Sequence, residues 1–399
     1  MKKALLQTVF GQVKRGGIAV RYWDGEETRY GDAPPQAKII FLKEPSILTG
    51  LEDPTLTFAE FYMDGIIDYE GSLDEIIRLV EWNWSKRQQT DELGKKVWNS
   101  ALRAVNSVAD KLTDKKNIQQ HYDLGNDFFS LWLDKTMSYS CAYFKQATDS
   151  LFNAQLQKID LALKKLRLKP GERLLDIGSG WGWLILRAAQ QYGVKALGIT
   201  LSQEQYDKTR ERIAEAGLTG QVDVKLISYM DINEAEYQFD KIVSIGMFEH
   251  VGQKNLPVYM KKVHDLLVQG GTSLLHSITN VIEHEPNTWM RKYIFPGGYV
   301  PTLREIVNLL PDYDFHLLQA ESLRLHYAMT LEHWYRNFSR YKEEVEQKFG
   351  RRFVRMWSLY LQGCAASFRV SGLDIHQLVF TKGLNNTLPL TWQDVYSEE

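Results

Sequence analysis

The sequence predicts an α/β protein built on a mostly parallel sheet with helical insertions, preceded by a small α+β module. Beyond residue 170, short runs rich in Val, Ile and Leu alternate with helical patterns. Such alternation is typical of parallel strands joined by crossover helices on both faces of a sheet. The first 85 residues lack it and carry turn signals instead. With 399 residues, against roughly 100–200 per domain, the chain is long enough for two domains.

Residues 1–85 are expected to form the small α+β module. Asp24-Gly25 lies between two short runs, which is the pattern of a β-hairpin. Ser72 followed by Glu75 predicts a capping box at the start of a helix. The elements expected here are strands at 18–22, 27–30 and 38–42 and helices at 57–63 and 72–84.

A polar, lysine-rich stretch at 86–115 is interpreted as an interdomain helix or linker, and 116–399 as the second domain. Its expected strands are 173–177, 195–200, 222–227, 241–245, 272–278 and a final one at 375–381, with a helix at 203–216. Two series of residues at helical spacing predict long helices between the last two strands: Trp334, Phe338, Tyr341, Val345 and Phe349, then Phe353, Trp357, Tyr360, Cys364 and Phe368.

Composition excludes several classes of protein. Lys and Arg number 48 against 50 Asp and Glu, so the net charge of −2 gives no overall basic field that would point to nucleic acid. The two cysteines, Cys141 and Cys364, cannot form a disulfide framework, and they suit a reducing cytosol. No metal-binding spacing is found, so no metal is expected. No run approaches the ~18–20 apolar residues that span a bilayer, and the charged start is interrupted before a signal peptide's apolar core could form.

A glycine-rich loop follows the strand at 173–177. It reads Asp176-Ile177-Gly178-Ser179-Gly180-Trp181-Gly182, and its glycines allow tight turns and close approach to a ligand. The spacing is not the GxGxxG of dinucleotide binders, the next strand ends in Thr200-Leu201-Ser202 without a ribose-binding acid, and no GxxxxGK[ST] loop occurs. The loop resembles that of the Rossmann-like class I S-adenosylmethionine (SAM) methyltransferases. A strand–helix turn without a ligand stays open at this point.

Polar residues also follow the next strands. Tyr229-Met230 comes after the third strand, Glu249-His250 after the fourth, and His276 lies near the end of the fifth. Ligands of open α/β sheets bind beyond the carboxyl ends of the strands, so Glu249 and His276 can offer a base or an anion-binding pair. Either residue alone fits a buried structural group, and we interpret His250 as one. Together with the glycine loop, the pair favours an active site.

Six blocks of sequence resemble the cyclopropane-fatty-acyl-phospholipid synthases. They cover nearly the whole second domain, in the family's order. The blocks are QHYDLGNDFF at 120–129, MSYSCAYF at 137–144, LDIGSGWG at 175–182, GMFEHVG at 246–252, KYIFPGG at 292–298 and CAASFR at 364–369. Ser179 departs from the family, which often has Cys there, and residues 1–85 match the family's N-terminal lipid-associated module only loosely.

The resemblance implies an enzyme that adds a SAM methyl group to the cis double bond of an acyl chain on a membrane phospholipid. A proton is then lost and a cyclopropane ring closes, with bound bicarbonate as the base. Matched by motif, the SAM-binding residues would be Tyr139, Ser140, Asp176, Gly178, Gly180, Trp181, Gly182, Thr200, Leu201, Ser202, Gln205, Tyr229 and Met230. The catalytic residues, which would also hold bicarbonate, would be Cys141, Glu249, His276, Tyr327 and the backbone of Ile278.

Cys364 matches a cysteine once regarded as catalytic in the family. It falls on the same helical stripe as Trp357, Tyr360 and Phe368, which favours a buried apolar residue over a nucleophile. A thiolate is also not needed if bicarbonate is the base.

The resemblance implies a cytoplasmic enzyme that meets its substrate peripherally, at an anionic membrane surface. Two basic clusters could contribute, Lys14-Arg15 and a second formed by Lys164, Lys165, Arg167 and Lys169. Homodimerisation stays open. The alternatives are a SAM-dependent N-methyltransferase of a small amine, methyl-branch formation on a lipid, and a lipid carrier with a relic methyltransferase domain.

Overall fold

The computed structural model of the chain describes residues 2–45, 53–85, 125–284 and 287–397. The expected linker at 86–115 therefore lies outside the described residues. The chain divides into two compact units. The first comprises Met1–Asn117, Asn287–Ile294 and Phe338–Ser371, and the second comprises Ile118–Pro286, Phe295–Asn337 and Gly372–Glu399.

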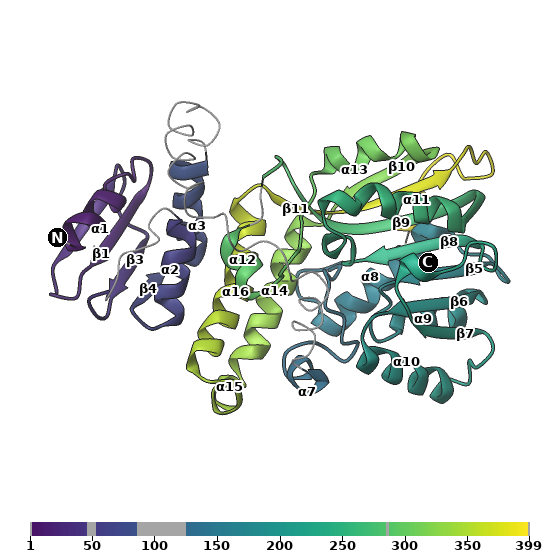
Figure 1. The fold of residues 1–399 in the computed structure, drawn as a ribbon, viewed down its shortest axis with the longest axis horizontal. Helices are drawn as coiled ribbons and strands as arrows, with labels where there is room; N and C mark the ends of the chain where they lie inside the picture. The colour runs from purple at the N-terminus through teal and green to yellow at the C-terminus, as the bar shows by residue number, and fades with distance from the viewer. Residues whose placement is uncertain (1, 46–52, 86–124, 285–286, 398–399) are drawn as a thin grey trace. The chain divides into compact units, whose positions relative to one another are not determined.

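The first unit contains a four-stranded sheet in the order β2-β1-β3-β4. β1 is antiparallel to β2 and parallel to β3, and β3 is antiparallel to β4. Its N-terminal elements are α1 (Lys2–Phe10), β1 (Gly17–Arg21), β2 (Glu27–Gly31), β3 (Ala37–Phe41), α2 (Pro54–Met63), β4 (Ile67–Gly71), α3 (Leu73–Val80) and a π-helical turn (Glu81–Ser85) (Figure 1). The expected α+β module is confirmed, including the hairpin around Asp24-Gly25.

Three elements from late in the sequence belong to this first unit: α12 (Thr288–Tyr293), α15 (Lys342–Phe349) and α16 (Arg351–Val370). α16 packs against α2 and α3. Arg355 Nη2 donates to the carbonyl of Ile67 over 2.8 Å, and Tyr69 Oη donates to Gln362 Oε1 over 3.2 Å. The early module is thus completed by a helix from near the end of the chain.

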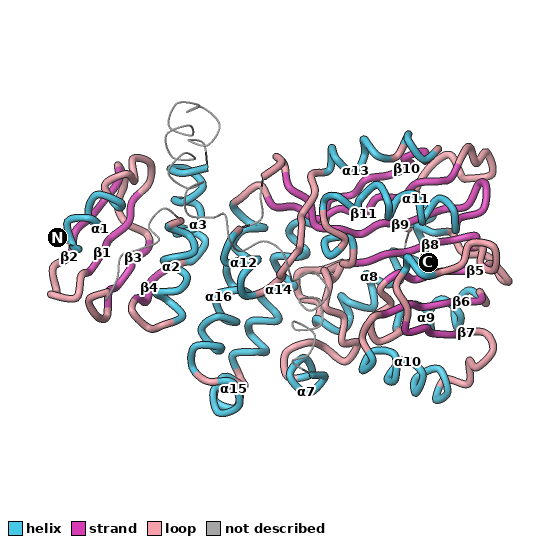
Figure 2. Tube along the Cα trace, viewed as in Figure 1, coloured by secondary structure: helices cyan, strands magenta, loops and turns pink. Residues whose placement is uncertain are grey.

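The second unit is built on a seven-stranded sheet in the order β10-β11-β9-β8-β5-β6-β7. The five strands from β9 to β7 in that order run parallel, whereas β11 is antiparallel to both β9 and β10. Figure 2 shows the strands side by side with helices around them. The bounds are β5 (Arg173–Ile177), β6 (Lys195–Thr200), β7 (Val222–Leu226), β8 (Phe239–Ile245), β9 (Leu267–Asn280), β10 (Phe315–Ser322) and β11 (Leu373–Lys382).

The helices of the second unit alternate with these strands. They are α7 (Gly125–Ser130), α8 (Leu151–Leu166), α9 (Trp183–Tyr192), α10 (Gln203–Glu215), α11 (Leu256–Leu266), α13 (Leu303–Leu309), α17 (Gln393–Tyr396) and most of α14 (Arg324–Ser339). Short 3₁₀ turns lie at Tyr229–Asp231, Phe248–His250, Gln253–Asn255 and Pro311–Tyr313. None of the helices within the described ranges is both long and apolar enough to cross a bilayer.

Two apolar clusters pack against opposite faces of the large sheet. Leu174 belongs to one cluster and its neighbour Leu175 to the other, as do Leu274 and Leu275. Because successive strand residues point to opposite faces, these pairs show that both faces are covered. The predicted parallel sheet with helices on both sides is confirmed.

Local details differ from the sequence predictions. Strands β4 and β10 were not expected, since their mixed or exposed patterns carry little apolar signal. Ser72 caps α3 by accepting from the Asp74 amide rather than in a capping box, because Glu75 is paired with Arg78. The series from Trp334 to Phe349 crosses a break between α14 and α15.

Candidate functional site

The glycine loop leaves β5 at the carboxyl edge of the sheet. Gly178, Gly180 and Gly182 all have positive φ, at +85°, +54° and +83°. A Cβ on Gly182 would lie 2.5 Å from Thr209 Cγ2, so position 182 admits no side chain without displacing α10. The loop therefore holds the start of α9 tight against α10, whereas a Cβ on Gly180 would meet nothing within 4 Å.

The ends of β6 and β7 contribute further residues expected to bind SAM. Thr200 Oγ1 donates to Gln205 Oε1 over 2.7 Å and accepts from the Ser202 amide over 3.1 Å. Leu201 and Met230 are 59% and 48% exposed, unusual for apolar residues beside a buried sheet end. An exposed apolar rim above a polar turn suits a ligand with both an apolar ring and polar groups.

An aromatic cluster surrounds Tyr139. Its ring centroid lies 5.5 Å from that of Phe129, 5.3 Å from Trp132 and 5.3 Å from Trp334. Several ring faces and edges thus gather in one place, next to a segment that the sequence assigns to SAM binding. Such a lining excludes water and stabilises a nearby cation.

Two side chains of α8 form hydrogen bonds to Ser140. Lys158 Nζ donates to Ser140 Oγ over 2.8 Å, and Gln155 Nε2 donates to the Ser140 carbonyl over 2.9 Å. Burial lowers the pKa of Lys158 to about 8, and burial raises the pKa of Asp176 to about 7, each opposed by the other's charge. The sequence analysis missed Gln155 and Lys158, although a polar pair on the apolar face of a helix was a visible signal.

Glu249 is 8% exposed and follows β8. Its Oε1 accepts from the Ile278 amide over 2.6 Å, and burial raises its pKa to about 7 although that hydrogen bond opposes the shift. His276 is fully buried in β9, two residues before Ile278 and on the same face of the strand. Burial lowers the pKa of His276 well below its ordinary value, so the ring is neutral.

Cys141 and Tyr327 are connected to the strand that carries His276 and Ile278 by hydrogen bonds to the backbone of Leu323. The Leu323 carbonyl accepts from the Tyr327 amide over 3.1 Å and receives the Cys141 thiol at 3.9 Å. The Leu323 amide donates to the Ile375 carbonyl over 2.8 Å, and Ile375 lies opposite Ile278 in the sheet. We call Cys141, Glu249, His276, Ile278 and Tyr327 the carboxyl-edge site.

Two buried polar atoms of the carboxyl-edge site lack a hydrogen-bond partner in the described part of the chain: Glu249 Oε2 and His276 Nε2. Unsatisfied buried polar atoms are rare in folded proteins and call for an explanation. A small oxyanion that can both donate and accept hydrogen bonds fits them. In this structure the Ile278 amide is occupied by Glu249, so its expected role toward a bound anion would require that carboxylate to move.

The two cysteines differ in setting. Cys141 is fully buried, and burial raises the pKa of its thiol. Cys364 lies on α16 in the first unit, and burial raises its pKa to about 12. Neither thiol is ionised at neutral pH, which weighs against a thiolate nucleophile.

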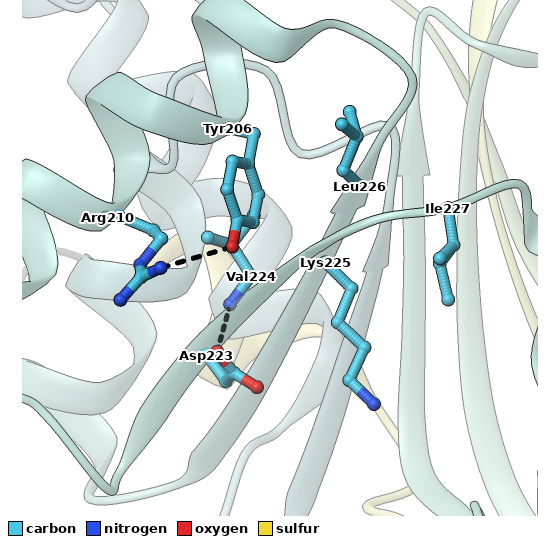
Figure 3. A pocket seen from close by; sticks show the side chains of 7 residues that line it. All are labelled: Tyr206, Arg210, Asp223, Val224, Lys225, Leu226 and Ile227. Carbon is cyan, nitrogen blue, oxygen red and sulfur yellow. Dashed lines mark hydrogen bonds between the residues drawn. The ribbon is translucent and has the colours of Figure 1, made fainter.

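An open depression lies elsewhere on the second unit, along the outer strand β7 (Figure 3). Its volume is about 570 Å³, and Arg210 donates there to the hydroxyl of Tyr206 over 3.3 Å. None of its lining residues is expected to bind SAM or bicarbonate: Tyr206, Arg210, Asp223, Val224, Lys225, Leu226 and Ile227. We assign it no role.

The raised pKa of Glu249 predicts a pH-dependent contribution to stability. The folded protein keeps the proton up to about pH 7, whereas the unfolded chain releases it near the ordinary value of 4.5. Stability due to Glu249 is therefore complete at low pH and declines as pH rises toward the folded pKa. The difference in unfolding free energy between wild type and Glu249→Gln should fall by on the order of 2–3 kcal/mol from about pH 5 to about pH 8 in urea titrations. A difference that is constant with pH would contradict this, since all other groups are common to both proteins.

Two family models match the chain. One is described as mycolic acid cyclopropane synthetase and matches residues 109–378. The other, at residues 5–88, is described as a domain of unknown function (DUF7884).

Curated relatives match nearly end to end. A protein of Pseudomonas putida named probable fatty acid methyltransferase is 36% identical over 95% of this chain and 96% of its own length. The cyclopropane-fatty-acyl-phospholipid synthase of Escherichia coli K12 is 36% identical over 94% of this chain and 93% of its own. The crystal structure of mycolic acid cyclopropane synthase CmaA1, complexed with SAH and CTAB, has a TM-score of 0.63 and 35% identity, covering 67% of this chain and 97% of that one. The chain belongs to the cyclopropane synthase family of SAM-dependent methyltransferases.

Proposed function

We propose that this protein transfers a methylene group from SAM to the cis double bond of an unsaturated acyl chain on a membrane phospholipid, closing a cyclopropane ring, with bound bicarbonate as base. The carboxyl-edge site carries the proposal, because it combines a buried carboxylate, a neutral buried imidazole and two unpartnered polar atoms. The nearly full-length match to a phospholipid-modifying synthase supports it.

SAM would lie across the carboxyl edge, held by the residues that the sequence assigned: Tyr139, Ser140, Asp176, Gly178, Gly180, Trp181, Gly182, Thr200, Leu201, Ser202, Gln205, Tyr229 and Met230. When bound, it supplies the electrophilic methyl group. An alkene is a weak nucleophile, so alignment matters, and positioning contributes ~7–11 kcal/mol in the best intramolecular cases. The glycine loop and the turn after β6 are anchored by backbone hydrogen bonds, which lets them hold that alignment.

The aromatic cluster around Tyr139 would protect the reaction from water. Attack of the double bond on the methyl carbon leaves a carbocation, which water would trap as an alcohol. Each ring face contributes ~0.5–2 kcal/mol to a nearby cation. Phe129 and Trp132 are almost fully buried, so this lining is dry and fixed.

Bicarbonate would sit against the carboxyl-edge site and supply the base that removes a proton from the added methyl group. As a carboxylate, Glu249 can only accept hydrogen bonds, so its Oε2 would receive the bicarbonate hydroxyl. His276 and Tyr327 can donate to the anionic oxygens. Cys141 would close the cage as a neutral, buried side chain. A catalytic role for Cys364 stays a prediction that its raised thiol pKa disfavours.

Peripheral contact with an anionic membrane is proposed for the first unit, in a cytoplasmic setting. Lys14 and Arg15 are exposed, and the Arg15 guanidinium lies 4.4 Å from the ring of Trp82. In the second basic cluster expected from the sequence, Lys165 is buried and Arg167 forms two 2.9 Å hydrogen bonds to Asp394, which leaves Lys164 and Lys169 for such contact. The division into a lipid-associating module at 1–85, a linker at 86–115 and a catalytic domain at 116–399 is also part of this proposal. Homodimerisation stays open.

Methyl-branch formation is the second candidate, because one near-full-length relative carries the name of a fatty acid methyltransferase. Branching shares the initial methyl transfer and differs in the fate of the cation. An N-methyltransferase of a small amine would have no use for a buried oxyanion cage, so the unpartnered atoms of Glu249 and His276 speak against it.

The purified protein, given SAM and vesicles of a cis-unsaturated phospholipid, should add 14 mass units per modified acyl chain with loss of the olefinic proton signals. Lipid mass spectrometry and proton NMR measure these two changes. The same added mass with olefinic proton signals retained would assign branching chemistry instead. Unchanged lipid, with SAM bound in calorimetry, would overturn the lipid proposal.

Glu249→Gln should reduce turnover at least about a hundredfold, since an amide cannot stand in for the carboxylate that orients the base. SAM affinity should stay within about twofold of wild type, because Glu249 lies outside the residues assigned to SAM. Steady-state lipid assays and calorimetry separate the two effects. Turnover equal to wild type would remove Glu249 from the mechanism.

Binding to anionic vesicles should exceed binding to neutral ones and weaken with added salt, as each Lys or Arg near such a surface contributes ~1 kcal/mol. Lys14→Glu with Arg15→Glu should reduce sedimentation with anionic vesicles. The matched control is Lys195→Glu with Lys254→Glu, the same charge change at exposed positions of the second unit. Equal losses in both variants, or equal binding to both vesicle types, would contradict the proposal.

A further inference from the structure

A buried chain of hydrogen bonds connects α8 to His276. Lys165 Nζ donates to Gln377 Oε1 over 2.7 Å, and Gln377 Nε2 lies 3.1 Å from His276 Nδ1. Lys165 is 1% exposed, and the other two residues are fully buried. Neither Lys165 nor Gln377 figures among the residues assigned above to SAM or bicarbonate.

The fold places these three residues together. Gln377 lies directly opposite His276 in the antiparallel pair of β11 and β9, so both side chains stand on the same face of the sheet. α8 packs on that face through Leu163 and Leu166, which share an apolar cluster with Leu274 of β9. Lys165 therefore reaches the sheet beside Gln377, and it also forms an ion pair with Glu321.

Only one assignment of donors and acceptors is consistent with the hydrogen bonds that connect Lys165, Gln377 and His276. A lysine ammonium has three N–H groups and no lone pair, so it can only donate. Burial lowers the pKa of Lys165, and the ion pair with Glu321 opposes that shift and favours the charged form. Gln377 must then turn its carbonyl oxygen to Lys165 and its NH₂ group to His276. The Nδ1 atom of His276 consequently accepts a hydrogen bond and carries no proton.

A neutral imidazole has one N–H group, so the proton of His276 resides on Nε2. Nε2 is the nitrogen that has no hydrogen-bond partner among the described residues. Glu249 Oε2 is the second buried atom of the carboxyl-edge site without a partner there. When Glu249 is a carboxylate, the Nε2–H donor and the Oε2 acceptor together match an oxyanion that also carries a hydroxyl. The complementary groups thus lie on β9 and in the turn that follows the neighbouring strand β8.

We propose that Lys165 and Gln377 are positioning residues that hold His276 in the Nε2–H tautomer, so that it donates to an oxyanion held beside Glu249. The identity of that oxyanion as bicarbonate rests on the function proposed above. The tautomer of His276 depends only on the buried hydrogen bonds from Lys165 through Gln377.

Long-range ¹H–¹⁵N NMR on the full-length protein with ¹⁵N-labelled histidine tests the tautomer directly. His276→Asn identifies the signals of His276. A ring protonated on Nε2 alone is the expected result. Protonation on Nδ1, or on both nitrogens, would overturn the proposal.

Gln377→Glu provides the matching variant, because a carboxylate of the same size paired with Lys165 offers His276 only acceptors. Nδ1 should then acquire a proton, and lipid turnover should fall by about a hundredfold, the effect of losing one aligned donor. SAM affinity should stay unchanged, which shows that the protein remains folded. The control Gln146→Glu adds the same charge at an exposed position and should leave turnover unaltered. An unprotonated Nδ1 or retained turnover in Gln377→Glu would show that Gln377 has only a packing role.

The NMR result does not depend on the proposed activity. If no lipid product forms but Nε2 is protonated, the function fails and the tautomer assignment stands. If cyclopropane forms but Nδ1 is protonated, the function stands and the assignment fails.

Discussion

The backbone pairing of β9 on both of its sides is the constraint on which the site depends. β9 is 14 residues long, parallel to β8 on one edge and antiparallel to β11 on the other. The His276 carbonyl accepts from the Gly246 amide over 2.9 Å, which ties the end of β8 to β9 just before Glu249. A slip of one residue would turn His276 to the opposite face and bring Leu275 into its place. Two ladders of hydrogen bonds oppose that slip, so the imidazole is held by the sheet itself.

Burial of charge follows from this arrangement and has a free-energy cost. Glu249, Asp176 and Lys158 are all removed from water, and their pKa values move toward the neutral form. Each group keeps only part of the hydrogen bonding that would satisfy its charged form. An apolar core of the same size would not carry this cost, and a ligand that supplies the missing partners stabilises the folded protein.

Much of the fold could be predicted because its signals are local. The glycine spacing after Asp176 is contained within a few consecutive residues, and so is each apolar run of β5, β6 and β8. β10 escaped prediction since its exposed outer residues lack an apolar alternation. The pairing of Lys165 with Gln377 was invisible for another reason: the two residues are 212 positions apart, and each alone is typical of a solvated surface. Glu249 and His276 were predicted as a pair from their strand ends, whereas the hydrogen bonds that connect Lys165 and Gln377 to His276 depend on tertiary packing.

The position of α16 has a consequence for how the protein is made. Arg355 of α16 bonds to the Ile67 carbonyl across 288 positions of sequence. During synthesis at roughly 5–20 residues per second, the strands and helices around Ile67 emerge long before their helical partner. The surfaces of α2 and α3 that α16 covers therefore stay without this partner while six of the seven strands of the large sheet are synthesised. The first unit therefore cannot be completed until late in synthesis, although it contains the first residues translated.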